Sequence, residues 1–143
     1  MISYGRQSIE EADIEAVVKV LRGNRLTQGP AIEQFENALA AKAGSKYAVA
    51  VTSGTAALHV ACLAAGMTTN DTGITSALTF VASANAMRYC GAEVLLTDIE
   101  TDNLGMSVAS LEQRLSEHPD SKVVIPVSFA GLAHHMDKIR SVA

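Results

Sequence analysis

The residues with the clearest chemical potential form a short turn, Ser53-Gly54-Thr55, between two apolar segments. Alternating small and β-branched residues over 49–51 predict a buried strand before the turn, and an Ala-rich segment predicts a helix over 56–64 after it, ended by Gly66. The first amides of a helix have no internal acceptor and lie at its positive end. With the hydroxyls of Ser53 and Thr55 they could hold a phosphate, although the stretch alone favours an ordinary strand-to-helix turn.

Other residue types that often carry chemistry are less promising. His134 and His135 are adjacent, so their side chains diverge on any regular element, and no third ligand is spaced to join them; a solvated turn is favoured over a metal site. Cys62 and Cys90 lie on predicted helices among apolar residues, without CxxC spacing, so we expect neither a disulfide, a metal ligand nor a nucleophile. The chain has no GxGxxG after a strand and no GxxxxGK[ST], which excludes the dinucleotide fingerprint and the P-loop.

The N-terminal part of the chain predicts two helices. Ser8 and Glu11 have the spacing of a capping box, and the helix that follows is expected to run to about Arg22. Pro30 is placed to begin a second helix that Gly44 ends. The apolar residues expected to form the buried faces of these helices are Ile14, Val17, Val18 and Leu21 in the first, and Ile32, Phe35 and Leu39 in the second.

The remainder alternates between strands and helices. Strands are expected near Ile74, over 94–96 and over 123–127, and the helices between and after them over about 79–90, at Val108, Leu111 and Leu115, and over 136–143. Such alternation predicts an α/β fold with three layers, α/β/α, around a mainly parallel sheet. Ligands of these sheets bind at the carboxyl ends of the strands, where Ser53, Ser76 and Asp98 are expected to lie.

Composition limits the class of protein. The chain has 143 residues, of which 48% are hydrophobic, and this suits one globular domain with a substantial core. The net charge of −4 and the absence of a basic stripe argue against nucleic acid as a partner. No apolar run reaches about 18 residues and the first residues lack the apolar core of a signal peptide, so we expect a soluble, cytoplasmic protein and no membrane partner.

Five segments, in this order and spacing, resemble one known family. They are Arg25-Leu26-Thr27-Gln28-Gly29-Pro30, Ser53-Gly54-Thr55-Ala56-Ala57-Leu58, Leu78-Thr79-Phe80-Val81-Ala82-Ser83-Ala84-Asn85-Ala86, Gly91-Ala92 leading to Thr97-Asp98-Ile99, and Ile125-Pro126-Val127-Ser128-Phe129-Ala130-Gly131. The resemblance is to the DegT/DnrJ/EryC1/StrS family of pyridoxal-phosphate-dependent sugar aminotransferases of fold type I. The segments 4–9 and 89–92 look most like members that aminate C4 of a UDP-4-keto-6-deoxy-amino sugar on the route to pseudaminic acid.

The resemblance implies roles for individual residues. The segment that matches Gly54, Thr55 and Ala56 holds the phosphate of pyridoxal 5'-phosphate in the family, and the aromatic residue that matches Phe80 stacks on its pyridine ring. Without the family, Phe80 is interpreted as a core residue. Thr27 and Gln28 match a segment that lies near the nucleotide-sugar substrate and the partner subunit, and no residue of this chain matches a catalytic one.

The resemblance also divides the chain and limits its expected activity. Residues 1–30 match an N-terminal helix and a segment that contacts substrate and partner, and residues 31–143 match part of the cofactor-binding large domain, here a truncated one. The lysine that binds the cofactor covalently and the aspartate that pairs with its ring nitrogen fall beyond residue 143 in the family, so we expect this chain alone to be inactive.

Three interpretations stay open. The first is the N-terminal part of a sugar aminotransferase that transfers an amino group from an amino acid such as glutamate, and that occurs as a homodimer or with a full-length family member. The second is a non-catalytic module that keeps the scaffold for oligomerisation or partner binding. The third, weakened by the missing nucleotide fingerprints, is a stand-alone domain that binds phosphate or a nucleotide.

Overall fold

A computed structural model describes residues 5, 7–132 and 135–143. The chain divides into two compact units, residues 1–50 and 51–143, so the physical division comes later than the functional boundary expected after residue 30. Among the described residues, no helix has both the length and the apolar character needed to cross a membrane.

The first unit contains helices α1 (Glu11–Leu21) and α2 (Pro30–Ala43). The predicted capping box of Ser8 and Glu11 is wrong, because α1 begins after Glu10, whose backbone N–H donates to the Asp13 carboxylate at 2.9 Å. A short carboxylate at the third helical position reaches back to this amide equally well. The predicted limits of α2 are confirmed, with Pro30 at its first position and Gly44 in the left-handed conformation at its end (φ 65°).

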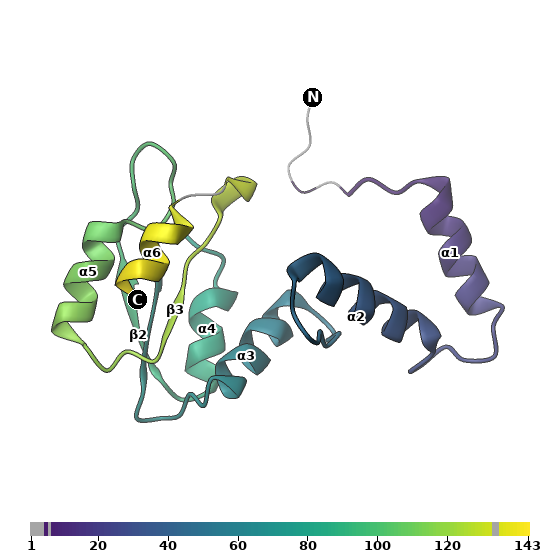
Figure 1. Ribbon diagram of the computed structural model, residues 1–143, viewed down its shortest axis with the longest axis horizontal. Coiled ribbons are helices and arrows are strands. Elements are labelled where there is room, and N and C mark those ends of the chain that lie inside the picture. Colours follow the sequence, from purple (N-terminus) through teal and green to yellow (C-terminus); the bar gives the residue numbers. More distant parts are fainter. Residues whose placement is uncertain (1–4, 6, 133–134) are drawn as a thin grey trace. The chain divides into compact units, whose positions relative to one another are not determined.

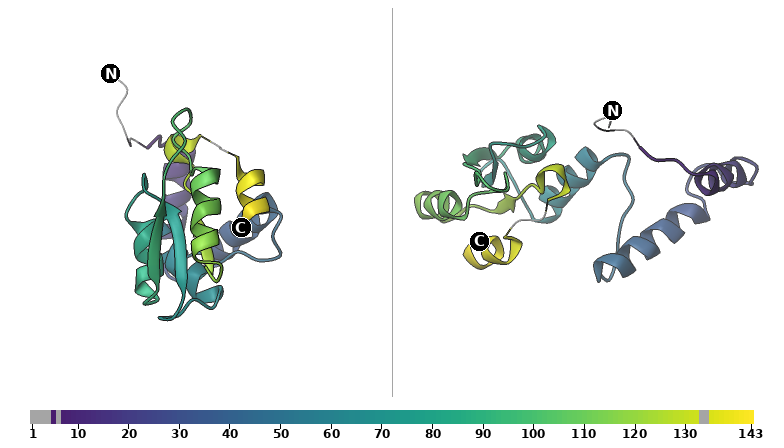
Figure 2. Two further views of the ribbon diagram at one scale, coloured as in Figure 1. Left: turned by 90° about the vertical axis from the view of Figure 1, so that its left-hand side faces the viewer. Right: turned by 90° about the horizontal axis from the view of Figure 1, so that it is seen from above.

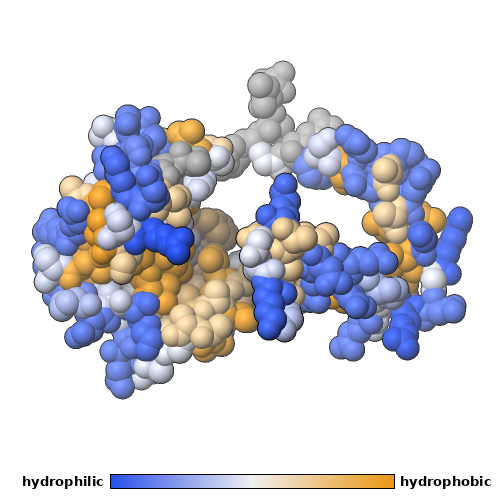
Figure 3. Space-filling model, in the orientation of Figure 1, coloured by the Kyte–Doolittle hydropathy of each residue, from blue (hydrophilic) through white to orange (hydrophobic). Residues whose placement is uncertain are grey.

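Most residues of the predicted buried faces of these two helices are exposed, and Val18 is half-buried. Val17 on α1 is 59% exposed and Phe35 on α2 is 57% exposed, and the single buried residue of the two helices is Ala40. An apolar stripe predicts which face of a helix will be covered but does not supply the covering element. Within the described residues of the first unit no element buries these stripes, and hydrophobic residues reach the surface of both units in Figure 3.

The second unit is built on a parallel sheet. Its strands are β1 (Thr72–Ser76), β2 (Glu93–Thr97) and β3 (Val123–Ile125), in the spatial order β2-β1-β3. Ile74 at the centre of β1 lies opposite Leu95 of β2 and Val124 of β3. The predicted parallel sheet is therefore confirmed, with every strand near its expected place.

Helices cover both faces of this sheet. One face carries α3 (Gly54–Ala64) and α4 (Ala82–Tyr89), where Cys62 and Met87 pack with Val94 and Val123. The other carries α5 (Val108–Glu117) and α6 (Met136–Val142), where Leu111 and Ile139 pack on Ile74. A short 3-10 helix, η1 (Phe129–Gly131), precedes α6. The layers are visible in Figure 1 and, seen from above, in Figure 2, and they confirm the predicted three-layer α/β/α fold.

Three element predictions need correction. The segment 49–51 is not a strand, although Ser53 after it is extended. The helix expected from residue 79 begins at Ala82. The strand expected over 123–127 ends at Ile125, because Pro126 has no N–H to continue the ladder.

The connection between α3 and β1 is a compact turn. Gly66 (φ 74°) ends α3 as predicted, and the Met67 N–H donates to the Cys62 carbonyl at 3.1 Å. The backbone N–H and hydroxyl of Thr68 then donate to the Asp71 carboxylate at 2.6 and 2.9 Å. The hydrogen bond from the Thr68 hydroxyl contributes most to lowering the pKa of Asp71 below its usual value. The hydrogen bond from the Thr68 N–H and the Lys122 ammonium at 3.9 Å lower this pKa further. The end of α3 is thereby fixed beside the amino end of β1.

Candidate cofactor site

The first turn of α3 has the geometry of an anion site. Ser53 precedes the helix in an extended conformation, and its hydroxyl accepts a hydrogen bond from the Ala56 N–H at 3.2 Å. The Ala56 amide, expected to be free, is therefore already used. In the described part of the chain no acceptor is found for the amides of Gly54 and Thr55. A Cβ added to Gly54 would meet nothing within 4 Å, so the approach to these two amides is open.

The helix α5 offers a direct comparison. It too begins after a capping serine, Ser107, but its first N–H, that of Val108, donates to the Glu100 carboxylate at 3.2 Å. Neither first turn contains an acidic residue, but no carboxylate among the described residues accepts a hydrogen bond from the first amides of α3. The positive end of α5 is thus neutralised from within the chain, while that of α3 is left for an external anion.

Chain direction places this turn at the carboxyl edge of the sheet. α3 ends beside the start of β1, and its 11 residues rise about 16 Å, which is also about the length of the five-residue strand. Its N-terminus therefore lies near the opposite end of β1, the edge where Ser76 ends the strand. α4 follows β1 and packs against α3, so the start of α4 lies at the same edge and on the same face.

The loop before α4 presents Phe80 to solvent. Phe80 is 74% exposed, so its interpretation as a core residue is wrong. The loop itself is well bonded: the Ala77 N–H donates to the Thr97 carbonyl at 2.9 Å, and the Ser83 N–H donates to the Phe80 carbonyl at 3.1 Å. An exposed aromatic side chain thus stands on a fixed backbone at the edge where the α3 turn lies.

Two further polar residues end strands, as predicted. Ser76 is 1% exposed, and its buried hydroxyl has no hydrogen-bond partner among the described residues. Because side chains alternate along a strand, it shares the α5 and α6 face with Ile74 and not the face of the α3 turn. Asp98 follows β2 with an exposed side chain, and its backbone N–H donates to the Ser110 hydroxyl at 3.0 Å.

The predicted substrate residues belong to the other unit. Thr27 and Gln28 are exposed in the connection between α1 and α2, and Gln28 has a positive φ of 50°, which is uncommon outside glycine. A hollow of about 340 Å³ adjoins Gln28 but not Thr27; its lining residues are Arg25, Gln28, Gly29, Pro30, Ile32, Glu33 and Glu36. Thr27 and Gln28 are thus described as part of the first unit, and the α3 turn as part of the second.

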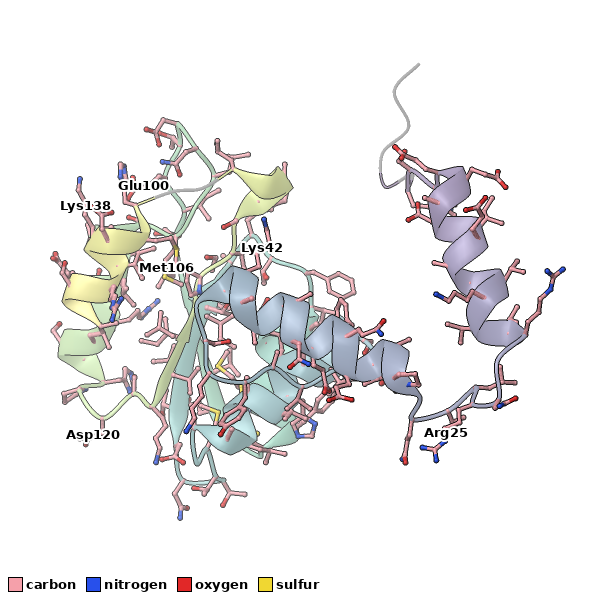
Figure 4. The ribbon with its side chains drawn as sticks, turned by 45° about the vertical axis from the view of Figure 1, so that its right-hand side comes forward. Arg25, Lys42, Glu100, Met106, Asp120 and Lys138 are labelled. Atoms are coloured by element: carbon pink, nitrogen blue, oxygen red, sulfur yellow. The ribbon has the colours of Figure 1, made fainter. Side chains whose placement is uncertain are left out.

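The α3 turn and Phe80 suit a phosphate ester with an aromatic ring, but neither lysine of residues 51–143 stands beside them. Of the two lysines in residues 51–143, Lys122 lies at the amino edge of the sheet with Asp71. Lys138 lies on α6, which covers the sheet face opposite α3 (Figure 4). Burial, and to a lesser degree the nearby Cys90, raises the pKa of the Cys62 thiol, which therefore stays protonated and is a poor nucleophile.

The structure also bears on metal binding and on what the sequence did not reveal. No group of three or more His, Cys, Asp and Glu side chains in the described residues could hold a metal ion, and His134 of the His134-His135 pair lies outside those residues.

The hydroxyl pair of Thr79 and Ser83, whose oxygen atoms lie 2.8 Å apart, was not predicted from the sequence. Its signal was a Thr and a Ser four residues apart near a helix start, where short hydroxyl side chains often bond to nearby groups of the chain.

Comparison with known proteins connects this geometry to a function. The profile of the DegT/DnrJ/EryC1/StrS aminotransferase family matches residues 7–143. The chain is 39% identical over 142 residues to "Spore coat polysaccharide biosynthesis protein SpsC" of Bacillus subtilis (strain 168), which covers 99% of this chain and 36% of that protein. It is 35% identical over 134 residues to "UDP-4-amino-4-deoxy-L-arabinose--oxoglutarate aminotransferase" of Shewanella sediminis (strain HAW-EB3). That match covers 94% of this chain and 34% of the relative.

Solved structures agree with the sequence matches. The PLP-form of "Putative sugar aminotransferase Spr1654 from Streptococcus pneumoniae" superimposes with a TM-score of 0.89 at 32% identity, over 99% of this chain and 36% of that one. "3-amino-5-hydroxybenzoic acid (AHBA) synthase" gives 0.86 at 28% identity, over 94% and 35%. The chain thus spans about a third of the length of the relatives it matches, and its α/β fold corresponds to part of the fold type I aminotransferase structures.

Proposed function

Because the chain belongs to the DegT/DnrJ/EryC1/StrS aminotransferase family, we propose that it supplies the N-terminal part of a pyridoxal-phosphate-dependent nucleotide-sugar aminotransferase. Residues 31–143 contribute part of the cofactor-binding large domain, and residues 1–30 contribute a segment that contacts substrate and partner. The observation that carries the proposal is the first turn of α3, which contains no acidic residue and has two amides without an acceptor among the described residues.

In this proposal the phosphate of the cofactor binds at the first turn of α3. The amides of Gly54 and Thr55 and the Thr55 hydroxyl donate to the phosphate, and Ala56 joins them where Ser53 releases its N–H. Phe80 packs against the pyridine ring and shields one side of it from water. When bound, pyridoxal phosphate supplies the electron sink that lets an amino group move between an amino acid and a keto sugar.

We propose a UDP-4-keto-6-deoxy sugar as acceptor and an amino acid such as glutamate as donor. The name of the Shewanella sediminis relative specifies a UDP-sugar aminated at C4 and oxoglutarate as the partner. The segments 4–9 and 89–92 resemble the members that act in pseudaminic acid synthesis, which favours that acceptor. Thr27 and Gln28, beside the polar hollow of the first unit, are assigned to the substrate.

The second candidate is a non-catalytic module that binds a copy of itself or a full-length family member. The exposed apolar residues of α1 and α2 favour it, because such surface is usually covered by a partner. In both proposals the chain alone does not transfer an amino group, because neither lysine of residues 51–143 stands beside the α3 turn.

An NMR titration of the ¹⁵N-labelled chain tests the proposed phosphate site. Pyridoxine 5'-phosphate is the probe because it lacks the aldehyde and does not react with lysines. We expect shifts of the Gly54 and Thr55 amides and none at Val108, the matched amide at the start of α5. Equal shifts at both helices, or none at Gly54 and Thr55, would refute the site.

A turnover assay tests the assignment of this chain as incomplete. With pyridoxal phosphate, glutamate and a UDP-4-keto-6-deoxy-N-acetylhexosamine we expect no amino sugar. Borohydride reduction followed by mass spectrometry should show no adduct at a specific lysine. An amino-sugar product, or one lysine modified stoichiometrically, would show that the chain carries its own catalytic lysine.

A further inference from the structure

The loop that carries Phe80 is fixed by side-chain hydrogen bonds as well as by its backbone. The Thr79 hydroxyl lies 2.8 Å from the Ser83 hydroxyl and 3.2 Å from the carbonyl oxygen of Phe80. The same Phe80 carbonyl accepts the Ser83 N–H at 3.1 Å. Thr79 and Ser83 therefore hold the peptide unit that follows the Phe80 Cα from two sides.

Burial makes this arrangement rigid. Ser83 is 7% exposed and Phe80 is 74% exposed, so the loop is anchored at its base while its aromatic ring is free of protein contacts over most of its surface. A buried hydroxyl that loses its partner is costly, so the pair resists opening. A hydroxyl has one proton and two lone pairs, and both contacts of Thr79 are satisfied when Ser83 donates to it and it donates to Phe80.

We propose that Thr79 is a positioning residue that fixes the direction in which Phe80 projects, and thereby sets the aromatic contact available to the ring of a pyridine phosphate. The inference rests on the proposed function, since it assigns Phe80 to the cofactor ring. Thr79 itself touches neither the ring nor the phosphate in this assignment. Thr79 acts by ordering the loop before the ligand binds. Ordering of the loop therefore does not reduce the free energy gained when the ring binds.

The test compares two ligands that differ in the ring. Dissociation constants of the full 143-residue chain are measured by NMR titration for pyridoxine 5'-phosphate and for propyl phosphate. The ring ratio is the dissociation constant of propyl phosphate divided by that of pyridoxine 5'-phosphate, and it reports the contribution of the ring to binding. The propyl phosphate constant alone reports binding at the α3 turn. A role confined to stability of the fold would change both constants together and lower the melting temperature.

Four variants separate the roles. Thr79→Val keeps the side-chain shape and removes the hydroxyl, Thr79→Ser keeps the hydroxyl, and Phe80→Leu removes the aromatic ring. Thr101→Val is the matched control, because Thr101 is exposed in a different loop. We expect Thr79→Val and Phe80→Leu to lower the ring ratio by about three- to tenfold, the range of one aromatic contact, with the propyl phosphate constant unchanged. Thr79→Ser and Thr101→Val should keep the wild-type ratio.

The outcomes that overturn the inference are distinct. A wild-type ratio in Thr79→Val, with a reduced ratio in Phe80→Leu, would show that Thr79 does not position Phe80. A ring ratio of one, measured for the wild-type chain, would show that Phe80 does not contact the ring, while the proposed phosphate site would still hold. Equal weakening for both ligands in Thr79→Val would assign Thr79 to fold stability alone. Failure of the wild type to bind either ligand would refute the proposed function itself.

Discussion

At the scale of single residues, Ser53 has two roles that compete. Its hydroxyl caps α3 by accepting the Ala56 N–H, which stabilises the helix, and in doing so removes one of the amides that a phosphate would use. Gly54 and Thr55 then provide the amides without an acceptor in the described chain. The site is therefore organised before any ligand arrives, because the cap defines where the free amides point.

Substitutions of Ser53 separate helix stability from anion binding. Ser53→Ala should lower the free energy of unfolding by about 1 kcal/mol, since it removes the cap. Ser53→Asn and Ser53→Asp both retain a cap, so urea denaturation should show near wild-type stability for each. Their phosphate affinities should differ, because the aspartate places a negative charge at the helix end. Equal phosphate affinity of the Asn and Asp variants would mean that the anion binds elsewhere.

Some residue roles were predictable from the sequence and others were not. The helix start after Ser53 follows from local preferences, so a single stretch of sequence predicted it closely: the helix was expected from Ala56 and begins at Gly54. The exposure of Phe80 was not predictable from the residues alone, because its apolar neighbours Leu78 and Val81 are typical of a core segment. The use of the Ala56 amide by Ser53 depends on side-chain geometry, which composition and spacing do not determine.

At the scale of elements, the contact between α4 and β1 depends on Gly73. A Cβ at this position would lie 2.2 Å from the sulfur of Met87 and 3.0 Å from the terminal methyl of Met67. Met67 and Met87 are both buried, so neither methionine side chain has open solvent to move into. The absent side chain at Gly73 thus lets α4 pack directly on the strand that leads to the Phe80 loop.

Gly73→Ala should therefore destabilise the chain by about 1–3 kcal/mol through overpacking, as measured by urea denaturation. The penalty should be smaller when Met87→Ala is also present, because the two substitutions act on the same contact. Gly54→Ala is the matched control, since its Cβ would meet nothing within 4 Å, and its effect should stay within about 0.5 kcal/mol. A Gly73→Ala penalty unaffected by Met87→Ala would place the strain elsewhere.

Element prediction succeeded where periodicity and partner were both local to the chain. The strands at Ile74 and Leu95 lie side by side, and the predicted alternation placed both. The segment 49–51 has equally strand-like residues, yet it pairs with none of the three strands β2, β1 and β3 of the described sheet. A strand needs backbone hydrogen bonds to a neighbour, and sequence pattern alone does not show whether a segment finds one.

At the scale of the whole molecule, the two outer edges of the sheet differ. On β2, the Leu96 carbonyl accepts a hydrogen bond from Arg114 Nε at 3.0 Å, and Arg114 is held by Glu117 at 3.0 Å. A charged side chain that occupies an edge carbonyl hinders the addition of another strand. In the described residues β3 bonds only to β1, and no side chain of this kind covers its outer edge. The β3 edge is thus the more open of the two.

We predict that the chain is a dimer, because large apolar residues on and beside α1 and α2 are exposed and contiguous apolar surface usually marks an interaction site. This surface includes Ile9, Val17 and Leu21 on or before α1, and Leu26 in the connection to α2 is 65% exposed. Pairing uses either this surface or the open edge of β3, and a stable two-fold interface should bury more than about 1,000 Å². Sedimentation velocity at micromolar concentration should show twice the mass of the chain.

Substitutions on α1 identify the surface that pairs. Val17 is 59% exposed on the apolar stripe, so Val17→Glu places a charge where a partner would pack, whereas Ala12→Glu adds the same charge to the same helix away from that stripe. If α1 forms the interface, Val17→Glu sediments as a monomer and Ala12→Glu as a dimer. A dimer in both variants assigns the pairing to the β3 edge. A wild-type monomer with the circular dichroism of a folded α/β protein would contradict the prediction, because these apolar residues would then remain in water without a partner.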